Sequence, residues 1–242
     1  MSRRRRLALV SGGAALLAAA GLWLWAVRGL PAGEEFREQV LARVAERRQG
    51  PWLPLWAISL RLQTAVVVWE DPAFYHHSGL SFASIRRAAL ENLRAGGYAR
   101  GGSTLTQQVA KNLFLTPEKS LRRKLREAIL ARRLEQALSK DQILEIYMNT
   151  ADWGEGIVGA EAAARHFFGK PAADLTWAEA ALLAGILPNP RRNDPFLDPH
   201  SAWRLRHRLL LKLLREEQIT REEFRQAGAT PLPRTTRLAL PE

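Results

Sequence analysis

The chain has 242 residues, 47% of them hydrophobic, which suits one compact domain with attached segments rather than two full domains. Its formal net charge of +12 predicts an anionic partner: nucleic acid, a membrane face or a phosphorylated substrate. There is no cysteine, which excludes disulfides, thiolate chemistry and cysteine metal sites.

The N-terminus has the pattern of a membrane anchor. A basic segment at 1–6 precedes an uncharged run at 7–27, which at about 1.5 Å per residue roughly spans a ~30 Å hydrocarbon core. We predict that 1–6 is cytoplasmic, that 7–27 crosses the membrane and that the rest lies outside. The alternative is a signal peptide cleaved at the small residues 18–20, but the apolar run continues past them. An outward-facing domain makes nucleic acid a poor partner and favours lipid headgroups or a phosphorylated lipid.

The remaining chain is predicted to be mainly α, with a linker helix at 28–50, one domain at 51–230 and a tail at 231–242. "AVVVW" is its only strand-like run. One or two closing helices are expected within 201–226. Three helix starts carry the hydroxyl-x-x-Glu/Gln pattern of a capping box, namely Thr104 with Gln107, Ser139 with Gln142, and Thr176 with Glu179.

The stretch "GGSTLTQQVAKNLFL" (101–115) predicts a helix with one polar face. Two glycines before a capped helix expose N–H groups and a positive dipole end, so we expect an anion site there. A plain solvated face is the alternative, but other helices of the chain are rich in Arg and Glu, whereas this face offers neutral donors and one lysine. At about 100° per residue, the face consists of Thr104, Gln107, Gln108, Lys111 and Asn112.

Carboxylates stand out at two further places. Glu127 shares a helical face with apolar residues, one turn after Arg123 and Lys124, which predicts a partly buried acid under basic groups rather than a surface ion pair. Glu70 and Asp71 end an apolar run before a proline, where a carboxylate can face a cleft or simply form a cap or turn. No metal site is predicted, because two adjacent histidines (76 and 77) point in different directions.

Five segments in order resemble the motifs of the peptidoglycan glycosyltransferase family, most of all its monofunctional biosynthetic transglycosylases. The resemblance covers about residues 52–199, and too little chain follows for a penicillin-binding transpeptidase domain. The segments are "EDPAFYHHSG", "GGSTLTQQVAKNLFL", "RRKLREAILARRLE", "KDQILEIYMNTADWGEGIVGAEAAARHFFGK" and "LTWAEAALLAGILPNPRRNDP".

The resemblance implies an enzyme of the cytoplasmic (inner) membrane, with its catalytic domain on the periplasmic side. It would polymerise lipid II into glycan strands: the 4-hydroxyl of one disaccharide attacks the anomeric carbon of the growing chain and expels undecaprenyl diphosphate with inversion. The implied fold is helical, lysozyme-like and two-lobed, with a membrane-embedded smaller lobe around 82–100. Expected partners are lipid II, the growing glycan chain, the membrane and other cell-wall synthesis proteins. No cofactor is required, and a role for a divalent cation (Mg²⁺ or Mn²⁺) is left open.

Motif matching also implies the residue roles. Glu70 would be the general base, and Glu127 would support the departing diphosphate directly or by positioning nearby cations. Pro72 departs from the basic residue often found there, so we expect altered affinity. The implied substrate-binding residues are Asp71, Phe74, His77, Ser103, Thr104, Gln108, Lys111, Asn112, Arg123 and Lys124.

Two other functions fit parts of this sequence. A lysozyme-like glycan hydrolase would use Glu70 as an acid, but it has no need of the basic groups suited to a diphosphate. A non-catalytic membrane scaffold would keep the fold without needing carboxylates at both sites.

Overall fold

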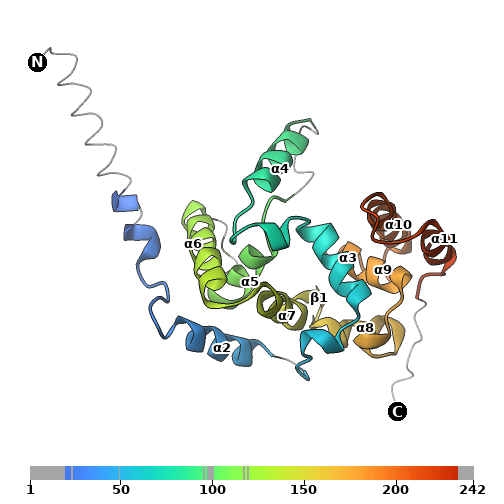
Figure 1. Ribbon diagram of the computed structural model, residues 1–242, viewed down its shortest axis with the longest axis horizontal. Helices are drawn as coiled ribbons and strands as arrows, with labels where there is room; N and C mark the ends of the chain where they lie inside the picture. The colour runs from blue at the N-terminus through green and yellow to red at the C-terminus, as the bar shows by residue number, and fades with distance from the viewer. Residues whose placement is uncertain are drawn as a thin grey trace, which may run out of the picture.

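The computed structural model describes residues 20–22, 24–48, 50–94, 96, 101–116, 118 and 120–233, and this part of the chain is mainly helical, as predicted (Figure 1). A short helical stretch at 20–22 and 24–27 comes first. The later elements are α2 (Phe36–Arg47), η1 (Leu55–Ala57), α3 (Leu60–Glu70), η2 (Phe74–His76), α4 (Phe82–Arg94), α5 (Leu105–Phe114), α6 (Leu121–Ala137), α7 (Lys140–Thr150), β1 (Asp152–Gly154), β2 (Ile157–Val158), α8 (Ala160–Phe168), η3 (Ala172–Asp174), α9 (Trp177–Ile186), α10 (Pro199–Arg215) and α11 (Arg221–Ala229).

The predicted membrane helix at 7–27 lies mostly outside the described residues. From residue 20 onward, the described part of the chain contains no helix that is both long and apolar enough to cross a bilayer.

The core is built around α9, which is apolar on all sides. Its residues 178 and 180–186 are buried, and it packs against α3 and α10. A helix without a polar face is stable only inside a protein, so its neighbours must cover it. The Trp153 side chain is fully buried beside it, and its indole N–H donates to the Leu183 carbonyl oxygen at 3.2 Å.

The prediction that "AVVVW" has strand character is wrong, because residues 65–69 form the second half of α3. Ala65 and Val66 are buried with Leu62, which is the i, i+3, i+4 spacing of a helix packed on a core. Packing against α9 and α10 therefore overrides the strand preference of three consecutive valines. Within the described residues, the strands are the short antiparallel pair β1 and β2, which the sequence did not predict.

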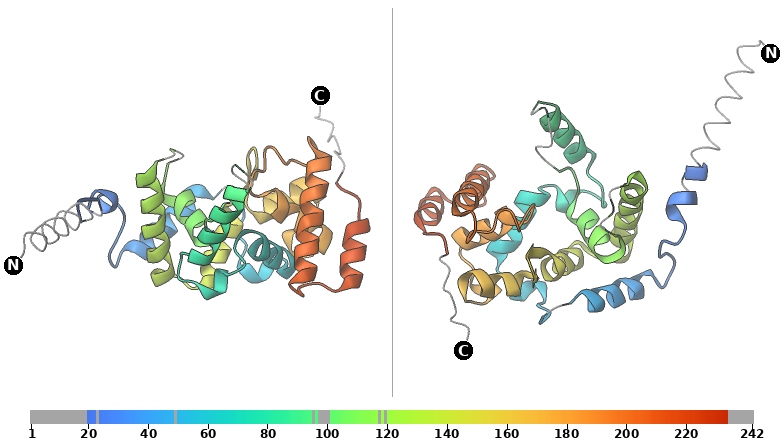
Figure 2. Two further views of the ribbon diagram at one scale, coloured as in Figure 1. Left: turned by 90° about the horizontal axis from the view of Figure 1, so that it is seen from above. Right: turned by 180° about the vertical axis from the view of Figure 1, so that it is seen from behind.

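Helix starts follow the predicted pattern. The three predicted capping boxes are present at the starts of α5, α7 and α9. A fourth, at Thr220 and Glu223, begins α11. The linker helix corresponds to α2, and the closing helices are α10 and α11, which lie side by side (Figure 2).

Helix α4 stands away from the other helices (Figures 1 and 2). Phe82 and Leu93 are each 79% exposed, so one of its sides offers apolar surface. Its base rests on Gly102, where a Cβ atom would lie 3.1 Å from the Ile85 Cα atom. The backbone of α4 therefore leaves little room for a side chain at Gly102.

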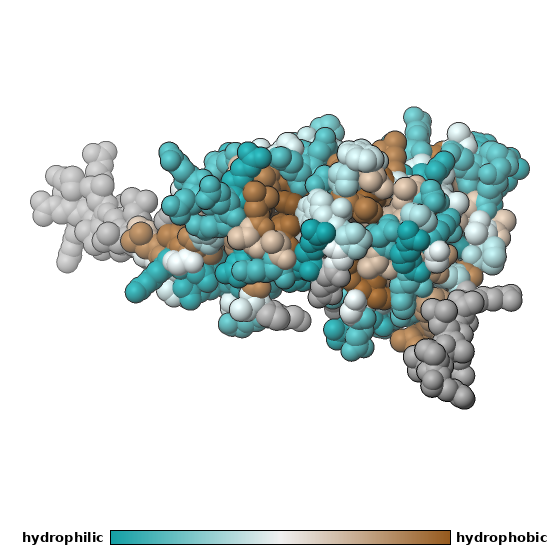
Figure 3. Space-filling model, turned by 90° about the horizontal axis from the view of Figure 1, so that it is seen from below, coloured by the Kyte–Doolittle hydropathy of each residue, from teal (hydrophilic) through white to brown (hydrophobic). Residues whose placement is uncertain are grey.

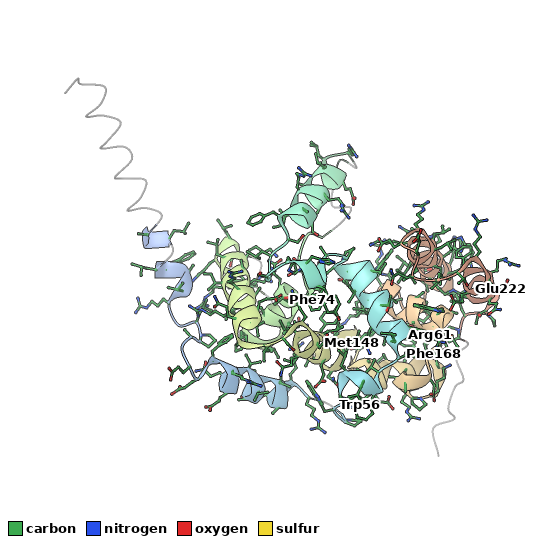
Figure 4. All side chains as sticks on the ribbon, viewed as in Figure 1. Trp56, Arg61, Phe74, Met148, Phe168 and Glu222 are labelled. Carbon is green, nitrogen blue, oxygen red and sulfur yellow. The ribbon has the colours of Figure 1, made fainter. Side chains whose placement is uncertain are left out.

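Exposed apolar side chains also occur outside α4. The two tryptophans of "GPWLPLW" differ: the Trp52 indole donates to Glu145 Oε1 at 2.8 Å, whereas Trp56 is 86% exposed. Figure 4 shows Trp56 at the edge of the domain, with Phe74 and Met148 near its middle. Hydrophobic patches interrupt the hydrophilic surface on the face shown in Figure 3.

The corner at Gly79 lies directly against α6. Its φ is +92°, and a Cβ atom placed on it would lie 2.9 Å from the Ala131 carbonyl oxygen. A side chain would therefore meet both an unfavourable backbone angle and a collision with backbone atoms.

We expect Gly79→Ala to lower the free energy of unfolding by more than about 2 kcal/mol, because both effects act together. Gly33→Ala is the matched control, since φ there is +85° and no atom lies within 4 Å of the added Cβ. The control should cost about 1 kcal/mol. Denaturant unfolding followed by circular dichroism measures both, and equal losses would contradict the collision with α6.

Candidate active site

The site is arranged along α5, between the end of α3 and the first turns of α6. Glu70 is the last residue of α3, and Glu127 lies in the second turn of α6. On α5, the partly exposed polar side chains are Gln108, Lys111 and Asn112. The opposite face is buried, as the helical spacing predicted, and comprises Leu105, Thr106, Val109, Ala110 and Leu113.

Gln108 links Glu70 to the interior. Its Nε2 donates to Glu70 Oε2 at 2.6 Å, while its Oε1 accepts from the Tyr147 hydroxyl at 3.4 Å. Burial and then the negative charge of Glu70 raise the pKa of Tyr147 well above its usual value, so this hydroxyl remains a donor. The amide of Gln108 is therefore oriented with its NH₂ group toward Glu70. Sequence reasoning missed Tyr147, because nothing along the chain places it near Glu70.

Glu127 is a buried acid under basic groups, as predicted. It is 3% exposed, its Oε1 contacts Lys124 Nζ, and its Oε2 lies 3.7 Å from an Arg123 guanidinium nitrogen. Lys124 Nζ also donates to Ser103 Oγ at 2.8 Å, which joins α6 to the loop before α5. The carboxylate therefore holds two cations near the surface.

Lys111 lies within the electrostatic field of both carboxylates. Burial lowers its pKa, and the charges of Arg123 and Lys124 act in the same direction. The negative charges of Glu127 and Glu70 oppose this by favouring the ammonium form. A cation in the field of two acids can thus stabilise negative charge on a bound group.

The expected anion site at the start of α5 is occupied by the protein itself. Asp71 is 1% exposed, and its Oδ2 accepts from the Leu105 backbone N–H at 3.0 Å. The same oxygen lies 2.9 Å from His77 Nε2. Because His77 Nδ1 accepts from the Gly79 N–H at 3.1 Å, Nε2 carries the proton and donates to Asp71. Asp71 and His77 therefore position α5 in this structure.

Thr104 completes the same junction. It is fully buried, and its hydroxyl donates to the Gly79 carbonyl oxygen at 2.7 Å. Gln107, which the helical spacing placed on the open face, is also buried because its side chain closes the capping box with the Thr104 N–H at 3.0 Å. We name Asp71, His77, Gly79, Thr104 and the Leu105 N–H the α5 junction.

The structure divides the predicted substrate-binding residues into two groups. Six are at least partly exposed around the two carboxylates, and their contact with substrate stays a prediction. Asp71, Phe74 and Thr104 have almost no exposed surface, and His77 is nearly covered, so these four shape the site from within. The six exposed residues are Ser103, Gln108, Lys111, Asn112, Arg123 and Lys124.

Phe74 has a packing role. Its ring is buried, and the Lys140 ammonium lies 4.5 Å from the ring centroid.

Within the described part of the chain, no three His, Asp or Glu side chains gather as metal ligands would.

Two carboxylates on either side of a polar helix face suit general acid–base chemistry at a glycosidic bond. The chain belongs to the Transglycosylase family, whose model matches residues 37–215. That range contains the whole site.

Curated relatives agree with this assignment. The biosynthetic peptidoglycan transglycosylase of Azoarcus sp. is 48% identical over 156 residues, covering 64% of this chain and 68% of the relative. That of Rhodospirillum centenum is 47% identical over 193 residues, covering 79% and 82%. Penicillin-binding protein 1A of Aquifex aeolicus is 45% identical over 168 residues, covering 69% of this chain but 23% of the relative.

A crystal structure of Penicillin-Binding Protein 1A from Haemophilus influenzae aligns with 77% of this chain and 18% of its own, at 20% identity and a TM-score of 0.47. That likeness is too weak to carry a structural argument. The family model and the relatives confirm the predicted enzyme class, a peptidoglycan glycosyltransferase.

Lys111→Met should raise the free energy of unfolding at pH 7, because it removes a charge that the fold desolvates. The folded pKa of Lys111 is lowered, so the unfolded chain binds more protons between the folded and unfolded pKa values, and native stability rises with pH there. The gain of the variant should therefore shrink as the pH approaches the ordinary lysine value of 10.5.

Denaturant unfolding at several pH values checks this prediction. Lys170→Met is the control, because Lys170 forms an ion pair with Glu179 at 2.6 Å and its loss should not stabilise the fold. If the Lys111→Met variant were less stable than the native chain at pH 7, the attraction of Lys111 to Glu70 and Glu127 would outweigh the cost of burying its charge.

Proposed function

We propose that the chain polymerises lipid II into glycan strands by inverting transfer, in which the 4-hydroxyl of an acceptor disaccharide displaces undecaprenyl diphosphate from the donor. The observation that carries this proposal is the buried Glu127, which holds Lys124 and lies 3.7 Å from an Arg123 guanidinium nitrogen. An enzyme of this class must bind a diphosphate near one acid and a reacting hydroxyl near the other. The polar face of α5 supplies both places.

Glu70 is assigned as the general base. Its Oε2 accepts from Gln108 Nε2 at 2.6 Å, a hydrogen bond that fixes the direction of the carboxylate. In the reaction it would remove the proton from the acceptor hydroxyl as the new glycosidic bond forms. A positioned base of this kind contributes on the order of 10²- to 10⁴-fold to the rate.

Glu127 is assigned to the leaving-group side. Because it is buried and bound to Lys124, it acts by holding cations rather than by contacting the sugar. Arg123, Lys124 and Lys111 would then face the diphosphate that departs. Cations that are fixed in advance stabilise the charge on the leaving oxygen without reorganising.

The glycan hydrolase is the weaker candidate. Hydrolysis of a neutral polymer releases no diphosphate. It therefore does not explain why three cations lie near one buried carboxylate. It also does not account for a lysine that is kept partly buried, with a lowered pKa, between two acids.

We further propose that residues 7–27 anchor the chain in the cytoplasmic membrane, with the domain on the periplasmic side. The support is the uncharged run itself, flanked by basic residues at 1–6 and 28, and the apolar side of α4. Lipid II, the growing glycan and the membrane are then the partners, other cell-wall synthesis proteins are expected, and no cofactor is needed. A chain released from membranes by alkaline carbonate would contradict the anchor.

Purified full-length protein should convert lipid II into polymer that muramidase digests. Glu70→Gln should lower turnover by at least about 10²-fold and leave donor binding nearly unchanged, because its role is confined to the transition state. Lys111→Ala should weaken donor binding as well as turnover, because it contacts the diphosphate before and during the reaction. Gel analysis of polymer, with binding of a phosphoglycolipid donor mimic, separates the two effects.

Glu222→Gln is the matched control, since this exposed glutamate lies on α11 at the far end of the domain (Figure 4). It should keep the full rate. Folded Glu70→Gln protein with a near-normal rate would remove Glu70 as the base. Shortening of preformed strands without polymer from lipid II would favour the hydrolase.

A further inference from the structure

A pocket of about 390 Å³ lies where the helical stretch at 24–27 meets the end of α5 and the first turns of α6. Its lining includes three arginines of α6, Arg122, Arg123 and Arg126, and one acid, the exposed Glu118. The charge around this pocket is therefore strongly positive. Nothing in the proposed reaction uses Arg122 or Arg126.

Backbone carbonyl groups hold two of these arginines in place. Arg122 donates to the Trp25 carbonyl oxygen at 3.3 Å, and its guanidinium carbon lies 4.8 Å from the centroid of the Trp25 ring. Arg126 donates to the carbonyl oxygens of Ala26 at 3.1 Å and Arg28 at 2.6 Å. Carbonyl oxygens and an indole ring orient a guanidinium but leave its positive charge unneutralised.

The arginines also act on one another. Burial, and then the charge of Arg122, lower the pKa of Arg126, which is the direction expected for crowded cations. The Nε atoms of Arg122 and Arg123 are buried and have no hydrogen-bond partner among the described residues. An anion in the pocket would relieve the repulsion and accept from guanidinium N–H groups that face the space.

The remaining walls are apolar. Trp25, Phe114, Leu115 and Leu121 line the same pocket, and Leu121 is 73% exposed. A small inorganic ion does not need such walls, whereas an amphiphile with an anionic head and hydrocarbon chains fits both parts. We propose that this pocket binds a phosphate group, carried by an anionic phospholipid. The proposal uses the proposed function only in placing the domain at a membrane.

This pocket is distinct from the diphosphate side of the reaction site. Arg122 and Arg126 are four residues apart and share one side of α6, whereas Lys124 lies about 200° around the helix from Arg122. Among the described residues, their hydrogen bonds go to residues 25–28, not to Glu127 or Ser103. Arg123 alone borders both places, through its 3.7 Å approach to Glu127.

The test is native mass spectrometry of the detergent-purified full-length chain, titrated with dioleoyl phosphatidylglycerol or dioleoyl phosphatidylcholine. We expect a one-to-one adduct that prefers phosphatidylglycerol. Arg122→Gln should weaken it about fivefold, as should Arg126→Gln as a second variant. Arg132→Gln is the matched control, since this exposed arginine lies on another side of the same helix, and its adduct should stay unchanged.

Inorganic phosphate and lipid II serve as competitors. Arginine-dependent binding of phosphate without a lipid adduct would support the phosphate site and assign it to the free ion. Displacement of phosphatidylglycerol by lipid II would overturn the proposal, because the pocket would then belong to the donor site. Equal binding of both phospholipids, or an equal loss in Arg132→Gln, would overturn it too. Since binding is measured, these outcomes do not depend on whether the chain polymerises lipid II.

Discussion

The arrangement of this site depends on one buried carboxylate, that of Asp71. It accepts hydrogen bonds from the first N–H group of α5 and from His77, whose other ring nitrogen holds the corner at Gly79 against α6. Because Glu70 precedes Asp71 directly, the proposed base is fixed to the helix that carries Lys111. The same junction reaches α6, which carries Glu127, so both acids are placed through a few short contacts.

Charge is distributed unevenly over this frame. Within the site, each acid is bound to a donor, Gln108 for Glu70 and Lys124 for Glu127, and Lys111 lies in the field of both. On the neighbouring side of α6, Arg122 and Arg126 contact neutral carbonyl groups, and Arg122 also contacts an aromatic ring. One helix therefore faces a site of paired acids and cations on one side and a basic pocket on the other. This accounts for part of the net charge of +12.

Sequence reasoning predicted the buried acid under basic groups at Glu127, but it did not predict the buried polar groups. Helical spacing puts Gln107 and Gln108 on the same face, yet the capping box turns Gln107 inward while Gln108 reaches Glu70. Asp71 and Thr104 have motif positions that suggest substrate contact, and the structure uses them as internal hydrogen-bond partners. The spacing of residues along one helix predicts the side of the helix on which each side chain lies. It does not predict which of those sides a neighbouring helix covers.

The sequence by itself determined the helical character, the capped starts of α5, α7 and α9, the family motifs and the acid at Glu127 under its basic groups. These depend on residues close together along the chain, where backbone geometry fixes the spacing. The tertiary structure alone decided that "AVVVW" is helical, that Tyr147 orients Gln108, and that Asp71 rather than a ligand occupies the start of α5. Each of these depends on packing between elements far apart in sequence, which no local pattern records.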